Sequence, residues 1–216
     1  MFVGHYGVSF ATRKVDASIP LWVLFLAVQW LDVIWAPLVL LGVEKVRIVP
    51  GFTATNPLDL YYMPYTHSLV AALVWSAAAA AAYHLWRRAN IRTSLLVGLA
   101  VFSHWILDFV VHRPDLPLYD NTAKVGLGLW DYPAAASGLE AALLLGAMAA
   151  FLRARPTRRT AIVTFGVFML GVQAYVFFGP PPVSPAAAAS TALAAYGIFA
   201  FLIWFLADRR VSVRAA

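Results

Sequence analysis

Six runs of mostly apolar residues, each close to 20 residues long, constrain the fold of this chain more than any other feature of its sequence. A helix of about 20 apolar residues is long enough to cross a hydrocarbon core about 30 Å thick. Hydrophobic residues make up 62% of the 216 residues and charged residues only 12%, which excludes an ordinary soluble domain. The sequence therefore predicts an all-α integral membrane protein with one domain, residues 1–216, and six transmembrane helices. The predicted spans are residues 20–42, 67–87, 93–111, 134–152, 160–178 and 188–207.

Basic residues fall on alternate connections between these runs, and this pattern predicts the topology. They are Arg13, Lys14, Arg87, Arg88, Arg92, Arg153, Arg155, Arg158, Arg159, Arg209, Arg210 and Arg214. The connections between them hold few basic residues and five of the ten acidic ones, Glu44, Asp59, Asp115, Asp120 and Asp131. Because Lys and Arg are enriched in cytoplasmic loops, we expect a multi-pass protein of the bacterial cytoplasmic (inner) membrane with both termini in the cytoplasm. The net charge of +6 is then a topology signal, and the expected partner is the lipid bilayer rather than nucleic acid.

Three ionisable residues stand at the end of the third apolar run. His104, Asp108 and His112 are four residues apart, so on an α-helix they drift by only about 40° per step and project from one face. Ionisable side chains at membrane depth are costly and mark ion, proton or catalytic sites. Two imidazoles and a carboxylate could form half of the shell of a divalent transition metal. A proton relay, or a satisfied polar cluster between helices, fits the same residues.

Further ionisable residues lie at similar depth in other runs. Asp32 and His104 each lie about 17–18 Å from the cytoplasmic start of their helices, and His67 stands near the outer end of the second run. This agreement in depth favours a shared site. Glu140, about 19 Å above the cytoplasmic end of the fourth run, could be a further ligand, a carboxylate that orients a histidine, or a general base. A hydrogen bond from Glu140 to a neighbouring helix is the alternative.

Residues 1–12 are apolar but too few to cross a membrane. As a short N-terminal half-helix they would span about 18 Å and could lift His5 into the bundle. The alternative is a frayed or interfacial N-terminus with a solvated His5, and the residues alone favour that alternative.

The two long connections between apolar runs have compositions that predict different structures. Residues 43–65 contain several prolines and a glycine, which indicates irregular structure with short turns. Residues 112–133 form a long connection of the kind that often covers a site as a lid or a substrate-binding wall. The last two runs carry no acidic or basic side chain in their interiors, so we expect them to be scaffold.

Four short pieces in the first half of the chain occur together in one known family. They are Gly4-His5, Asp32 in the first run, Thr66-His67-Ser68 and Ser103-His104-Trp105-Ile106-Leu107-Asp108. In this order they resemble the YdjM-like family of membrane-bound metal-dependent hydrolases. The resemblance implies a metal site made of His5, Asp32, His67, His104 and Asp108, and thus favours the half-helix. The family usually has a second aspartate two residues after the first; this chain has Ile34 there, which could leave one metal ion rather than two.

The resemblance implies a membrane-embedded, metal-dependent hydrolase. The position of the candidate residues in the outer half of a membrane bundle suggests a lipid or a lipid-linked ester or phosphoester as the substrate. We expect a divalent metal ion, with zinc as the first candidate. Its expected ligands are His5, Asp32, His67, His104, Asp108 and His112. Glu140, or Asp32 where it is not a ligand, would accept the proton during catalysis. The alternative is a non-catalytic accessory subunit of a membrane complex, or a small ion or proton transporter.

Overall fold

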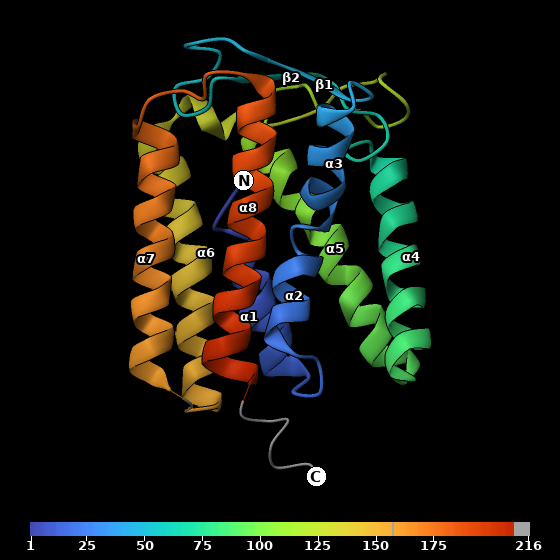
Figure 1. Cartoon of the computed structure of the whole chain (residues 1–216), viewed down its shortest axis with the longest axis vertical. Helices are drawn as coiled ribbons and strands as arrows, with labels where there is room; N and C mark the ends of the chain where they lie inside the picture. Colours follow the sequence, from blue (N-terminus) through green and yellow to red (C-terminus); the bar gives the residue numbers. More distant parts are fainter. Residues whose placement is uncertain (157, 210–216) are drawn as a thin grey trace.

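Five long helices form the wall of a bundle in the computed structural model of this chain, which describes residues 1–156 and 158–209 (Figure 1). They are α4 (Leu69–Arg87), α5 (Ile91–Val111), α6 (Pro133–Ala154), α7 (Arg159–Phe178) and α8 (Pro185–Ile203), which continues into the short π-helical turn η2 (Trp204–Asp208). Each is long and apolar enough to cross a membrane. Each also coincides within a few residues with one of the predicted spans.

The first predicted span is not one continuous helix. It is divided into α2 (Leu21–Ala27) and α3 (Trp30–Leu40), which are bent by 52° at the break, and only as a pair do they make a sixth span. The break falls at Val28 and Gln29, and both residues find partners outside their own helix. The Val28 carbonyl accepts a hydrogen bond from the His104 ring, and the buried Gln29 amide donates to the carbonyl of Phe2 at 3.1 Å. A tertiary hydrogen bond therefore satisfies the Val28 carbonyl at the break, and the Gln29 side chain ties the break to the N-terminal segment.

A short helix, α1 (His5–Val15), enters the bundle beside α6. The frayed N-terminus that the residues alone favoured is therefore wrong. The rings of Tyr6 and Phe10 pack against Phe25 of α2 with centroids 4.6 and 5.6 Å apart, and the Ser9 hydroxyl donates to the backbone of α2. Gly7 makes the close approach to α6 feasible, because a Cβ atom at this position would lie 2.5 Å from the carbonyl oxygen of Leu143.

The connection predicted as irregular contains an antiparallel pair of strands, β1 (Lys45–Ile48) and β2 (Leu58–Tyr62), so the chain is mostly helical but not all-α. The sequence did not reveal it because the strands are only four and five residues long. The connection between α5 and α6, which includes the 3-10 turn η1 (Leu129–Asp131), contacts the segment that contains this sheet. The Thr55 hydroxyl donates to the Trp130 carbonyl at 3.0 Å and the Lys124 ammonium to the Tyr61 carbonyl at 2.8 Å.

The two ends of the bundle differ in charge and structure. Figure 1 shows the sheet, the α5–α6 connection and the α7–α8 turn at one end, and the turns α1–α2, α4–α5 and α6–α7 at the other. The described basic residues of the predicted cytoplasmic side belong to this second end, whereas Arg210 and Arg214 lie outside the described residues. Met1 is buried inside the bundle with 6% of its surface exposed, so the first residue does not lie at either end. Exposed apolar side chains such as Leu73, Leu99 and Phe168 cover the outside of the helices.

The substitution Gly7→Ala tests whether α1 is docked against α6. The added methyl group would overlap the Leu143 carbonyl, and we expect a loss of about 1–3 kcal/mol in folding free energy, as is usual for overpacking. The matched control is Gly146→Ala in α6, where no atom lies within 4 Å of the added methyl group. Thermal unfolding in detergent should show a lower midpoint for Gly7→Ala only. Equal midpoints for the two variants would contradict this packing.

Candidate metal centre

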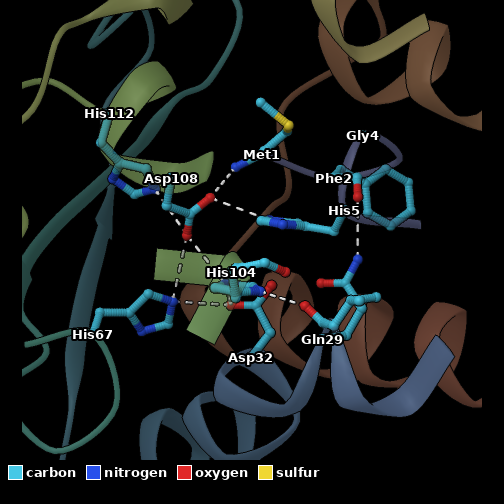
Figure 2. A network of polar contacts seen from close by, with 12 residues as sticks. Met1, Phe2, Gly4, His5, Gln29, Asp32, His67, His104, Asp108 and His112 are labelled. Carbon is cyan, nitrogen blue, oxygen red and sulfur yellow. Dashed lines mark hydrogen bonds and ion pairs between the residues drawn. The ribbon is translucent and has the colours of Figure 1, made fainter. Parts of the chain in front are cut away.

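Side chains from four separate elements meet in the interior of the bundle (Figure 2). His104 and Asp108 come from α5, Asp32 from α3, His67 from the turn before α4, and His5 from the first turn of α1. All are buried except Asp32, whose side chain keeps 17% of its surface exposed. The structure thus brings together the five residues that the resemblance assigned to one site.

Four of the ligand atoms form a closed ring of short distances. His104 Nε2 lies 3.1 Å from Asp108 Oδ2 and 3.7 Å from Asp32 Oδ1, and His67 Nε2 lies 3.8 and 3.3 Å from the same two oxygens. A tetrahedral ion with ligands at about 2.0–2.1 Å places neighbouring ligand atoms about 3.4 Å apart. The four sides of the ring are therefore close to the spacing of neighbouring ligands around a single divalent ion, and within it Asp32, His67 and His104 form a group whose ligand atoms all lie within 4.8 Å of one another.

Three histidine rings have their Nδ1 atoms engaged outside this ring. His104 Nδ1 lies 2.8 Å from the Val28 carbonyl oxygen, His67 Nδ1 lies 2.7 Å from Thr66 Oγ1, and His112 Nδ1 lies 2.8 Å from the Asp115 carboxylate. A carbonyl or carboxylate oxygen only accepts, so Nδ1 of His104 and His112 must donate. The free Nε2 of each neutral ring then carries a lone pair. Metal-binding histidines commonly have this arrangement.

The lone pairs point at carboxylate oxygens, which is unfavourable without positive charge between them. His104 Nε2 and both ring nitrogens of His5 lack a hydrogen-bond partner among the described residues, although they are buried. His5 Nε2 lies 3.2 Å from Asp108 Oδ1, which also forms an ion pair with the α-amino group of Met1. Buried polar atoms normally have partners. Either protons on the histidines or a bound cation would supply the missing interaction.

The geometry favours one ion rather than two at the centre. There are two groups of three potential ligands among the described residues, and within each group the ligand atoms all lie within 4.8 Å of one another. One group is His5, His104 and Asp108, and the other is Asp32, His67 and His104. Both groups require His104, and its Nδ1 is already bonded to Val28. Because a ring nitrogen donates its lone pair to one metal only, these two groups cannot both be occupied through His104.

Two predicted site residues lie at the margin of this centre. His112 Nε2 is 3.6 Å from Asp108 Oδ2, and its ring packs against Trp130 at 4.4 Å. Glu140 lies outside both ligand groups. Its carboxylate instead accepts the backbone N–H groups of Phe2 and Gly4 at 2.9 and 3.1 Å and the Gln173 amide at 3.3 Å. The geometry therefore assigns Glu140 to holding the segment that precedes His5, and the expected roles as ligand or general base find no support in these contacts.

Tyr196 of α8 is a site residue that the sequence did not reveal. Its hydroxyl donates to Asp32 Oδ2 at 2.6 Å, which leaves Oδ1 to face the histidines. The last span is therefore not scaffold alone. A tyrosine in an apolar run without polar neighbours gives no signal in the sequence, because its role depends on how α8 packs against α3.

The connection between α5 and α6 is closed on itself by an ion pair between residues near its two ends. The Arg113 guanidinium donates two hydrogen bonds to Asp131, at 2.8 and 2.7 Å, and these bonds lower the pKa of the Asp131 carboxyl. Glu44, which directly precedes β1, is 1% exposed. Burial raises the pKa of the Glu44 carboxyl, while the nearby His67 and hydrogen bonds from Thr66 and Tyr65 act in the opposite direction.

Comparison of the chain with protein-family models, with curated proteins and with solved structures gives no match.

The substitution Tyr196→Phe tests whether the phenol hydroxyl orients Asp32. Without its donor, Asp32 Oδ2 is free to turn toward the histidines, and we expect the affinity for a divalent metal to fall about 10–100-fold, as is typical when a group that orients a ligand is removed. Tyr175→Phe on α7, where the tyrosine is 64% exposed, is the matched control. Metal titration of both purified variants provides the measurement, and an unchanged affinity in Tyr196→Phe would refute the assignment.

Proposed function

We propose that this chain is a metal-dependent hydrolase embedded in the bacterial cytoplasmic membrane. In the proposed topology α2 and α3 form one broken span, the six spans alternate in direction, and the end with the basic turns faces the cytoplasm. The separation of basic turns from the sheet and outer connections supports this orientation (Figure 1). The metal centre then lies inside the membrane-embedded bundle, below the outer connections.

One observation carries the proposal: each of two imidazole Nε2 atoms, of His67 and His104, lies 3.1–3.8 Å from an oxygen of Asp32 and from an oxygen of Asp108. His67, His104, Asp32 and Asp108 would hold a single ion there. Mixed nitrogen and oxygen ligands suit zinc, which makes zinc the first candidate. A divalent ion bound there would supply Lewis-acid chemistry, polarising an ester or phosphoester and lowering the pKa of water.

Asp32 defines the side from which the centre can be reached. Its side chain is the most exposed of the four proposed ligands, at 17%, compared with 4% or less for His67, His104 and Asp108. A reacting group would therefore approach past Asp32, whose carboxylate could accept a proton where it is not bound to the metal. The surrounding apolar helices favour a lipid or a lipid-linked ester or phosphoester as the substrate. The resemblance of the four sequence motifs to the YdjM-like family supports hydrolysis as the reaction.

A non-catalytic accessory subunit, or a small ion or proton transporter, remains the rival proposal. The ion pair between Asp108 and the α-amino group of Met1 supports it, because it supplies positive charge to the cluster without a metal. In that case the histidines would carry protons, and the centre would hold α1, α3 and α5 together. The rival predicts a folded protein without stoichiometric metal.

Metal analysis of protein purified without chelator separates the two proposals. We expect about one divalent ion per chain in the wild type, and loss of most of this metal in His104→Ala and Asp108→Ala because each removes a ligand. His84→Ala is the control, since His84 is exposed near the end of α4. Folded wild-type protein that contains no metal, and takes up none of zinc, manganese or iron, would overturn the proposal.

Hydrolysis needs its own test with the metal-loaded protein. We expect release of fatty acid or phosphate from at least one class in a panel of bilayer lipids and lipid-linked phosphoesters, and a loss of this release of at least about 100-fold in His104→Ala. The His84→Ala variant should retain wild-type rates. Bound metal without hydrolysis of any substrate class would contradict the catalytic role and favour the accessory one.

A further inference from the structure

A buried carboxylate lies behind His67, on the side away from the metal centre. Glu44 belongs to the segment between α3 and β1 and is 1% exposed. Its Oε1 accepts the backbone N–H groups of Tyr65 and Thr66 at 2.8 and 3.0 Å, and its Oε2 accepts the Thr66 hydroxyl at 2.7 Å. Glu44 is thus fully engaged with the turn that carries His67, and the proposed reaction does not use it.

The direction of these hydrogen bonds fixes the state of His67. A threonine hydroxyl has one hydrogen, and here it is donated to Glu44. Thr66 Oγ1 can therefore only accept from His67 Nδ1, which lies 2.7 Å away. The proton of the neutral ring then sits on Nδ1, and Nε2 presents its lone pair to Asp32 and Asp108.

His67 differs in this respect from the other two oriented histidines. His104 and His112 donate to a carbonyl and a carboxylate, which cannot reverse their role. The hydroxyl beside His67 can either donate or accept, so Thr66 alone would permit both tautomers. Glu44, on the far side of the hydroxyl, favours the Nδ1–H tautomer because it takes the hydroxyl hydrogen, and it acts against Asp32 Oδ1, which lies 3.3 Å from Nε2 and favours a proton there.

We propose that Glu44 is a positioning residue that acts through Thr66 to hold His67 in the tautomer with a free Nε2. The inference rests on the proposed metal centre, because this free Nε2 is one of its four proposed ligand atoms. Glu44, Thr66 and His67 form a carboxylate–hydroxyl–imidazole chain of hydrogen bonds. In this chain the His67 ring donates to the Thr66 hydroxyl, and the Thr66 hydroxyl donates to the Glu44 carboxylate. The three residues are buried, with 1%, 0% and 3% of their surfaces exposed, so water does not compete for these hydrogen bonds.

The substitution Glu44→Gln keeps the shape of the side chain and reverses the polarity of the chain. The carbonyl oxygen of the introduced side chain can still accept from the two backbone N–H groups, but its amide must then donate to Thr66 Oγ1. The Thr66 hydrogen turns to His67 Nδ1, and the ring proton moves to Nε2, where it blocks metal binding. Nitrogen-15 NMR of histidine-labelled, metal-free protein at about pH 8, where histidine is mostly neutral, reads the tautomer directly. His67→Gln identifies the His67 signals.

We expect the Nδ1–H tautomer in the wild type, the Nε2–H tautomer in Glu44→Gln, and a fall in metal affinity of about 10–100-fold in that variant. Thr66→Ser retains the hydroxyl and should behave as the wild type, whereas Thr66→Val should lose the tautomer preference and bind metal more weakly. If Glu44→Gln does not fold, the Thr66 pair decides: equal tautomer populations and equal affinities in the Ser and Val variants would overturn the inference.

The two proposals can fail separately. A Glu44→Gln protein that folds with His67 still in the Nδ1–H form overturns the role of Glu44, whatever metal the wild type binds. A tautomer switch in protein that binds no metal supports the role of Glu44 and overturns the metal centre instead.

Discussion

Imidazole lone pairs and carboxylate oxygens face one another in the interior of this bundle. Such a cluster needs positive charge to be stable, and the surrounding elements are held together around it. Two buried carboxylates are costly unless they are paired or bind a cation. Asp32 and Asp108 nevertheless lie within 4 Å of the same two histidine nitrogens. The proposed divalent ion would compensate both carboxylates at once and join α3 and α5 to the turn before α4.

The irregular parts of the fold supply the groups around this cluster. The break between α2 and α3 leaves the Val28 carbonyl to orient His104. Glu140 and Gln173, from α6 and α7, bind the backbone of residues 2–4 and so place α1 with His5 at its start. Tyr196 of α8 holds one oxygen of Asp32. Nearly every helix of the bundle thus contributes either a candidate ligand or a group that orients one, which is how buried metal sites are usually supported.

The sequence predicted the parts of the structure that depend on local pattern. Long apolar runs located α4 to α8, and the four-residue spacing of His104 and Asp108 placed both on one face of α5. The sequence did not predict the break at Val28 and Gln29, because there is no glycine or proline at these two positions. What sets them apart from the rest of the run is their hydrogen bonds to distant parts of the chain. The contacts of Glu44 and Tyr196 were hidden for the same reason, since each role comes from a partner that is distant in the chain. The residues alone also favoured a frayed N-terminus, and only the family resemblance pointed to the buried half-helix that the structure has as α1.

X-ray absorption spectroscopy of the metal in purified, full-length protein tests the proposed centre most directly. We expect one type of site with mixed nitrogen and oxygen ligands at about 2.0–2.2 Å and the multiple-scattering signal of at least two imidazole rings, from His67 and His104. A metal surrounded by oxygen alone, without imidazole scattering, would show that these histidines do not bind it and would contradict the centre described above.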